Sequence, residues 1–189
     1  MEMSRGEMLR DRTTAGIIDS AAMVLAERGE AASMEEIASS AGIGRATLYR
    51  YFPNREELLG AIAAASVQEL AARVKEADLE AVPFEEAIAR LARGIIATGS
   101  KYIALTRDGV RHTDAYPEVN VDVVEPIRAL FRRAIADGSL REGFPPDVLM
   151  DLFSGLIKGA LDATASGRRG IEETAAAVTT LFLRGVRAS

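Results

Sequence analysis

The chain has 189 residues, of which 48% are hydrophobic and 27% charged, a balance typical of a globular protein with a buried core. It has no cysteine and a single histidine, His112, which excludes disulfides, thiolate catalysis and cysteine- or histidine-rich metal sites within one chain. The net charge of −5 does not indicate a nucleic-acid partner. The sequence shows neither a signal peptide nor an apolar run of membrane-spanning length, so we expect a cytoplasmic protein. We also expect that it needs no cofactor or metal.

Apolar residues recur at helical spacing almost throughout the chain, and no segment shows the alternation of a strand. We expect helices over about 13–28, 34–42, 44–52, 55–77, 84–100, 101–112, 117–137, 146–166 and 171–187. Ser33 and Glu36 stand in the spacing of a capping box, which predicts the start of the second helix. Gly138 and Gly167 fit helix ends, and Pro126 predicts a kink or break near Glu125.

The segment 37–55 contains no acidic residue, although the chain as a whole is acidic, and it holds three arginines and two tyrosines. A helix-turn-helix needs a small residue where its two helices touch, a permissive turn residue, and apolar residues that anchor the second helix. Ala38 can supply the contact and Gly42 the turn. The anchor residues are Ile43, Leu48 and Phe52, of which the last two share a helix face.

The opposite side of the third helix carries side chains suited to DNA. An arginine can bind guanine through two hydrogen bonds, a threonine offers a hydroxyl and a methyl group, and tyrosine hydroxyls suit phosphate oxygens. The alternative is a solvated helix face with no function. The joint pattern of cap, small residue, turn, acid-free window and proline stop favours a DNA-reading helix-turn-helix.

The segment "TTAGIIDSAAMVLAERGEAASMEEIASSAGIGRATLYRYFPNREELLGAI" resembles the N-terminal DNA-binding domain of the TetR family of bacterial transcriptional regulators. The resemblance covers about residues 10–70 without a gap, and "GIGRATLYRYFPNREELL" is among its most specific stretches. It implies an all-α fold, with a three-helix DNA-binding domain over 10–70 whose helix-turn-helix spans about 33–52. A long helix then joins this domain to a helical ligand-binding and dimerisation domain over 71–189.

The resemblance also implies a function, namely a homodimeric repressor that a small-molecule effector releases from a palindromic operator on double-stranded DNA. Carried over position by position, the recognition-helix contacts to DNA are Arg45, Ala46, Thr47, Tyr49, Arg50 and Tyr51. By the same resemblance, Ser33 and Arg55 hold phosphates at the starts of their helices.

The C-terminal half carries a weaker signal for a ligand pocket, which needs apolar walls with a few polar anchors. The candidates for its lining are Tyr102, His112, Tyr116, Phe131, Met150 and Phe153. The alternative for each of them is a plain core or surface position. A pocket here therefore rests on the resemblance to the family.

A dimer interface is expected on the last two helices, which in the family pair with their symmetry mates as a four-helix interface. Gly155, Gly159 and Ala163 form a stripe of small residues at i, i+4 and i+8, and the next helix adds Val178 and Leu181. The alternative is that these small residues pack inside one monomer.

Two other classes of function compete with a regulator. An enzyme would need a nucleophile with its base, a pair of carboxylates or a metal cluster, and no acidic pair stands out in the sequence. A helical dimerisation module would need no DNA-reading helix. We therefore expect a non-enzymatic regulator.

Overall fold

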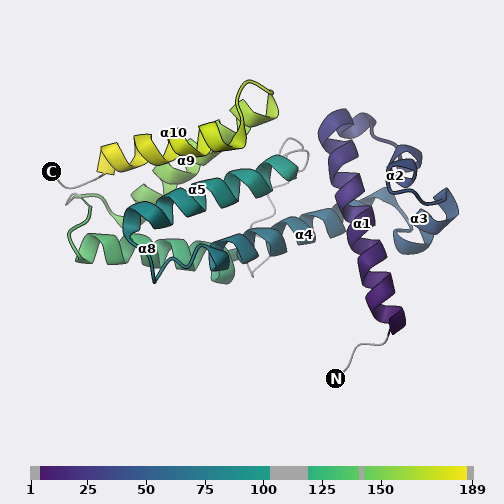
Figure 1. The fold of residues 1–189 in the computed structure, drawn as a ribbon, viewed down its shortest axis with the longest axis horizontal. Helices are drawn as coiled ribbons and strands as arrows, with labels where there is room; N and C mark the ends of the chain where they lie inside the picture. The colour runs from purple at the N-terminus through teal and green to yellow at the C-terminus, as the bar shows by residue number, and fades with distance from the viewer. Residues whose placement is uncertain (1–4, 103–118, 141–142, 187–189) are drawn as a thin grey trace. The chain divides into compact units, whose positions relative to one another are not determined.

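The computed structural model describes residues 5–102, 119–140 and 143–186, and the regular elements in those ranges are helices (Figure 1). The predicted all-α fold is confirmed. No helix in the described ranges is long and apolar enough to cross a membrane.

The described chain divides into two compact units. The N-terminal unit comprises residues 5–66 with Lys101 and Tyr102, and the described residues that remain form the C-terminal unit. This division differs from the predicted boundary at residue 70. Tyr102 is buried in the N-terminal core, and the ammonium group of Lys101 lies 3.0 Å from the Asp19 carboxylate, which explains why these two residues group with the first unit.

The helices of the N-terminal unit are α1 (Arg5–Arg28), the 3-10 turn η1 (Gly29–Ala31), α2 (Met34–Ser40), α3 (Arg45–Tyr51) and the front of α4 (Arg55–Glu76). The helix α1 begins eight residues before the predicted start at residue 13. Its first turns are rich in residues of good helix propensity and contain neither proline nor a β-branched residue, so they extend the helix without core contacts.

The core of the N-terminal unit draws on each of its α-helices. It comprises Ile17, Ala21, Ala22, Leu25, Ala32, Ile37, Ala38, Leu48, Phe52, Leu58, Ile62 and Tyr102. The helix α2 packs against both α1 and α3, so the apolar face of α3 is held by its neighbours and the opposite face is left to solvent.

The C-terminal unit contains the rear of α4, then α5 (Phe84–Lys101, up to Ser100), the π-helical turn η2 (Asn120–Val124), α8 (Glu125–Ala136), α9 (Pro146–Ala165) and α10 (Ile171–Val186). A kink or break was predicted near Glu125, and the structure shows a change of helix type there: the π-helical turn η2 passes into α8, with Pro126 in the first turn of α8. Val124 and Glu125 keep helical backbone angles, so the chain does not break at this point. Most of the helix predicted over 101–112 lies outside the described residues.

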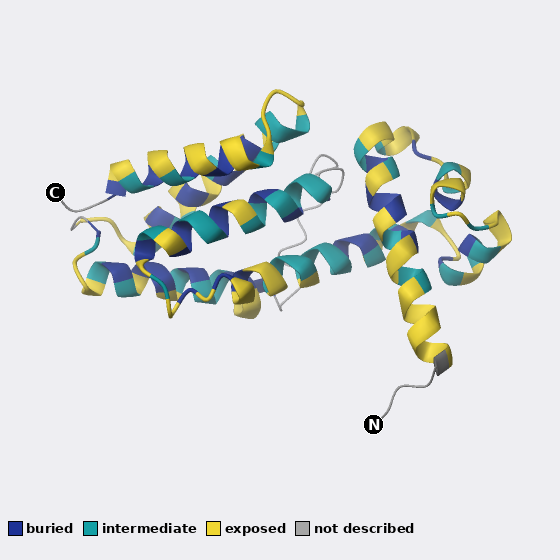
Figure 2. Cartoon of the chain, viewed as in Figure 1, coloured by how far each residue is buried: buried dark blue, intermediate teal, exposed yellow. Residues whose placement is uncertain are grey.

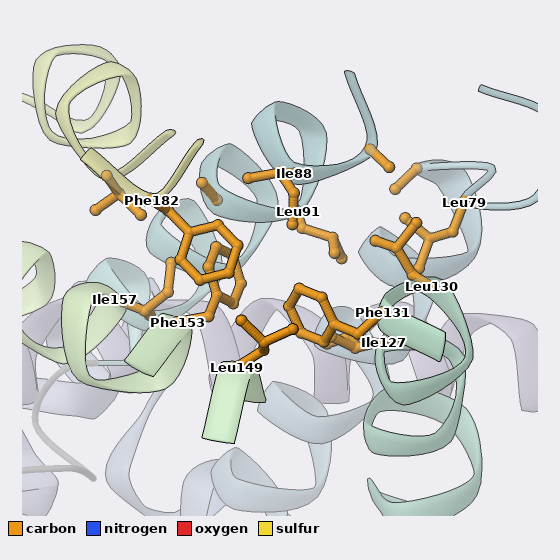
Figure 3. Packing of buried hydrophobic residues seen from close by; sticks show 14 of the residues in the cluster. Leu79, Ile88, Leu91, Ile127, Leu130, Phe131, Leu149, Phe153, Ile157 and Phe182 are labelled. Carbon is orange, nitrogen blue, oxygen red and sulfur yellow. The ribbon is translucent and has the colours of Figure 1, made fainter. Parts of the chain in front are cut away.

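Four phenylalanines form the centre of the C-terminal core, part of which Figure 3 shows. Phe131 is fully buried, and its ring centroid lies 6.1 Å from that of Phe84, 6.2 Å from Phe153 and 5.8 Å from Phe182. These edge and tilted contacts join α5, α8, α9 and α10 around one aromatic ring.

Candidate nucleic-acid interface

Hydrogen bonds at both ends of α2 fix the geometry of the helix-turn-helix. At its start, Ser33 Oγ accepts from the Glu36 N–H at 3.2 Å, and the Glu36 carboxylate accepts from the Ser33 N–H at 2.9 Å, which completes the predicted capping box. At its end, Gly42 has a φ of 66° and the Ile43 N–H donates to the Ala38 carbonyl at 3.0 Å. This is a Schellman motif, whose positive φ favours glycine, and it directs the chain into α3.

The capping box also sets the charge state at this corner. Hydrogen bonds from the Ser33 N–H and hydroxyl hold the pKa of Glu36 below its ordinary value, and the nearby Arg28 guanidinium adds to the effect. Glu36 is therefore ionised at neutral pH, and its negative charge lies at the positive N-terminal end of α2.

The short helix α3 has one buried face and one open face. Leu48 is fully buried and Phe52 is 6% exposed, so both predicted anchors lie in the core. Of the predicted DNA contacts, Arg45, Ala46 and Arg50 are exposed and Thr47 and Tyr49 are half-buried. Tyr51 is also half-buried, and it packs against the edge of the N-terminal core. The structure thus brings together all six side chains that the sequence singled out on this helix.

Each arginine of α3 lies over a tyrosine ring. The Arg45 guanidinium is 5.6 Å from the centroid of the Tyr49 ring, and the Arg50 guanidinium is 5.8 Å from that of Tyr51. A cation over an aromatic face is attracted by the ring quadrupole. This contact limits the freedom of the two guanidinium groups without neutralising their charge.

Ion pairing distinguishes these arginines from most of the described arginines of the C-terminal unit. Among the described residues, neither Arg45 nor Arg50 lies within 4.0 Å of a carboxylate oxygen. Six arginines of the C-terminal unit do lie that close to an acidic side chain: Arg73, Arg90, Arg93, Arg128, Arg132 and Arg169. The positive charge of α3 therefore remains available to an anionic partner.

The two residues expected to hold phosphates are engaged within their own unit. Ser33 Oγ donates to the Glu36 carboxylate at 3.0 Å. The Arg55 guanidinium donates to the carbonyl of Ala32, and its second terminal nitrogen lies 3.5 Å from the carbonyl of Glu30. The capping role of Ser33 was predicted from the sequence, whereas the bond from Arg55 to the Ala32 carbonyl was not. The phosphate contacts of both residues stay predictions.

The four described residues among those proposed for a ligand pocket are not brought together as one lining. Phe131 and Phe153 lie in the aromatic core, with Met150 packed against it, whereas Tyr102 belongs to the core of the N-terminal unit. The two other candidates, His112 and Tyr116, lie outside the described residues. Buried aromatic side chains predict both a core and a pocket wall, so the sequence could not separate the two.

A groove of about 730 Å³ in the C-terminal unit was not anticipated. It is lined by residues of α4, α5 and the start of α10, among them Arg73, Gly94 and Ile171. An ion pair between Arg93 and Glu172, 3.0 Å apart, joins two of its walls. Its volume suits a drug-sized molecule. No periodic pattern in the sequence indicates this groove, because its lining comes from three distant segments.

The dimer-interface candidates divide between surface and core. Gly155, Gly159 and Leu181 are exposed, Leu181 by 63%, and Ala163 is half-buried. Val178, in contrast, is 4% exposed and belongs to the C-terminal core, so the structure corrects its placement on the surface stripe.

The same face of α9 carries two apolar residues that the sequence analysis missed. Val148 and Leu152 are 41% and 51% exposed, and they precede Gly155 and Gly159 along one helical stripe. Their spacing of i and i+4 was the available signal.

Comparisons with known proteins agree with the helix-turn-helix. A sequence profile described as "Bacterial regulatory proteins, tetR family" matches residues 17–62. The HTH-type transcriptional repressor LfrR of Mycolicibacterium smegmatis (strain ATCC 700084 / mc(2)155) is 30% identical over 160 residues, which are 84% of this chain and 82% of that protein.

Solved structures extend the similarity over nearly the whole chain. The TetR-like transcriptional regulator LfrR from Mycobacterium smegmatis in complex with proflavine matches with a TM-score of 0.73 at 27% identity, covering 94% of this chain and 99% of that one. The TetR family transcriptional regulator PfmR from Thermus thermophilus matches with a TM-score of 0.68 over 89% of this chain and 97% of its own. Its identity of 24% supports the fold alone.

Proposed function

The chain belongs to the TetR family of bacterial regulatory proteins, and we propose that it is a transcriptional repressor that a small molecule releases from a palindromic operator. It binds DNA through its helix-turn-helix, with α3 in the major groove. A bacterial regulator of this kind works on the chromosome, and we therefore place it in the cytoplasm.

One observation carries this proposal: the two arginines of α3 have no acidic partner in the described structure, on an open helix face of a chain with net charge −5. In the proposed complex, Arg45 and Thr47 contact base edges, and Arg50 contacts a base or a phosphate. The hydroxyls of Tyr49 and Tyr51 donate to phosphate oxygens at the edges of the groove.

The proposed dimer forms through α9 and α10, which pack against each other and leave an apolar stripe exposed. Leu152 and Leu181 are its largest exposed side chains, while Gly155 and Gly159 allow the partner helix to approach closely. Because two-fold symmetry in the protein mirrors symmetry in the DNA, the operator is an inverted repeat. Its half-site centres lie about 34–36 Å apart, or a multiple of that spacing.

The proposed effector site lies in the C-terminal unit, where the groove lined by α4, α5 and α10 offers space and both signs of charge. Proflavine, which is bound in the structure of the similar LfrR, is a planar aromatic cation and a suitable first probe. The helix α4 contributes Arg73 and Glu76 to this groove and Leu58 to the core of the N-terminal unit. A ligand that prefers one arrangement of α4 would bias the DNA-binding unit.

Binding of the wild-type dimer to a genomic DNA pool, followed by footprinting of the selected sites, tests the proposed function. We expect protection of an inverted repeat and an affinity that falls steeply with salt concentration. Protection of a half-site by a monomer, or no sequence preference at any salt concentration, would contradict it.

The effector is tested by linkage. If proflavine releases the operator, saturating operator must weaken proflavine binding by the same factor, which typically corresponds to about 1–3 kcal/mol. Equal dissociation constants with and without operator, for a dye that releases the DNA in the same buffer, would rule out the two-state coupling.

A further inference from the structure

The first turns of α1 form an arm that the core of the unit does not explain. Residues 6–12 are all exposed, as Figure 2 shows in yellow, and the first member of the buried N-terminal cluster is Ile17. At about 1.5 Å of rise per residue, these seven residues extend the helix by about 10 Å. Burial of apolar surface in the core therefore does not account for this part of α1.

One face of this arm lines a groove with the end of α3. The groove has a volume of about 310 Å³ and is lined by Gly6, Leu9, Arg10, Thr13, Arg50 and Tyr51. The four residues from α1 follow the spacing i, i+3, i+4 and i+7, so they share one side of the helix. The groove therefore joins the arm to the helix proposed to read DNA.

The charge of this groove is positive. None of the six described residues that line it is acidic, whereas the two larger grooves of the C-terminal unit include acidic residues such as Glu172 and Asp122. Within the described part of the chain, neither Arg10 nor Arg50 forms an ion pair. Two guanidinium groups at one concave site, with no counter-charge, are suited to bind an anion, and guanidinium binds phosphate oxygens particularly well.

We propose that the groove between α1 and α3 binds a backbone phosphate of the operator, beside the bases that α3 contacts. Arg10 and Arg50 supply the positive charge and the Tyr51 hydroxyl is a further donor. The inference rests on the proposed function, because α3 must lie in the major groove for a phosphate of the same duplex to reach Arg10. It adds the N-terminal arm, outside the helix-turn-helix, to the DNA-binding surface.

The test compares Arg10→Gln with Arg12→Gln in the full-length dimer. Arg12 lies on the same exposed arm, is not among the groove residues and has no ion pair in the described structure, so the two variants lose the same charge at neighbouring positions. The affinity for the footprinted operator is measured from about 0.1 to about 0.5 M KCl. We expect Arg10→Gln to lower the slope of log K against log[salt] by about 0.9, which is a loss of about eightfold at 0.1 M if the two lines meet near 1 M.

A set of operator duplexes identifies the phosphate that binds in the groove. Each duplex carries one neutral methylphosphonate in place of a backbone phosphate, at a different position beside the half-site. At one position the substitution should weaken operator binding by the wild-type protein and by the Arg12→Gln variant to the same extent. It should weaken binding by the Arg10→Gln variant less, because only the contacts from Arg50 and Tyr51 remain to be lost. Competition by inorganic phosphate, beyond that of chloride at the same ionic strength, would instead assign the groove to a free anion and overturn the proposal.

Equal slopes for Arg10→Gln and the wild type, or an equal loss in both variants, would overturn the inference and leave the proposed function intact. Absence of sequence-specific binding by the wild type would instead refute the proposed function itself.

Discussion

Replacement of Arg55 by alanine should destabilise the N-terminal unit, because its guanidinium donates to the carbonyl of Ala32. Ala32 is 3% exposed, and its carbonyl accepts no other hydrogen bond in the described structure. Hydrogen bonds to charged groups contribute about 1.5–3 kcal/mol, and a buried carbonyl without a donor costs a similar amount. The contact to Glu30 at 3.5 Å is too long to add much. We therefore expect a loss of about 2 kcal/mol.

The assay is urea unfolding of the wild-type, Arg55→Ala and Arg12→Ala proteins, with circular dichroism as the signal that monitors unfolding. Arg12 is exposed and unpaired in the described structure, so its replacement should change the free energy of unfolding by less than about 0.5 kcal/mol. If Arg55→Ala were as stable as Arg12→Ala, the assignment of Arg55 to the Ala32 carbonyl would be refuted. The salt dependence of DNA binding then tests its second predicted role, since a phosphate contact lowers the slope by about one.

Four other substitutions test separate parts of the molecule. Arg45→Ala should weaken operator binding by about 1–3 kcal/mol and relax the preference at one base pair, measured on a set of operator variants; an equal loss on every sequence would contradict a base contact. Leu152→Glu should convert the dimer to a monomer in analytical ultracentrifugation, and an unchanged dimer would exclude the α9–α10 interface. Ser33→Ala should lower the free energy of urea unfolding by about 1 kcal/mol through loss of the helix cap, and a loss near zero would show that the cap adds no stability. The pKa of Glu36 is lower in the folded state, so its contribution to stability is present above its unfolded pKa and is lost as the pH falls through the lowered value. Glu36→Gln should therefore make the melting temperature depend less on pH on the acid side. Plots of melting temperature against pH that remain parallel for the two proteins would reject this linkage.

Local chemistry explains which parts of the fold could be predicted from the sequence. The capping box at Ser33, the turn at Gly42 and the change of helix type before Pro126 each depend on residues within a few positions of one another. The buried face of α3 followed from the spacing of Leu48 and Phe52 for the same reason. These features therefore appear in the structure close to where the pattern placed them.

The remaining features depend on contacts between distant segments. Nothing near Tyr102 in the sequence indicates that it lies in the core of the N-terminal unit, and the bond from Arg55 to Ala32 spans 23 residues. The exposed start of α1 lacks an apolar stripe, so periodicity placed the helix start eight residues late. On α10, Val178 and Leu181 share an apolar segment, but only packing decides that Val178 lies in the core and Leu181 on the surface.

The central claim is that an acidic chain reads DNA through the unpaired arginines of α3. The most direct measurement is the salt dependence of affinity for the footprinted operator, for the wild type and for the double variant Arg45→Gln, Arg50→Gln. The account predicts a steep negative slope for the wild type, a slope lower in magnitude by up to about two in the double variant, and loss of the footprint. An unchanged footprint and an unchanged slope in the double variant would contradict it.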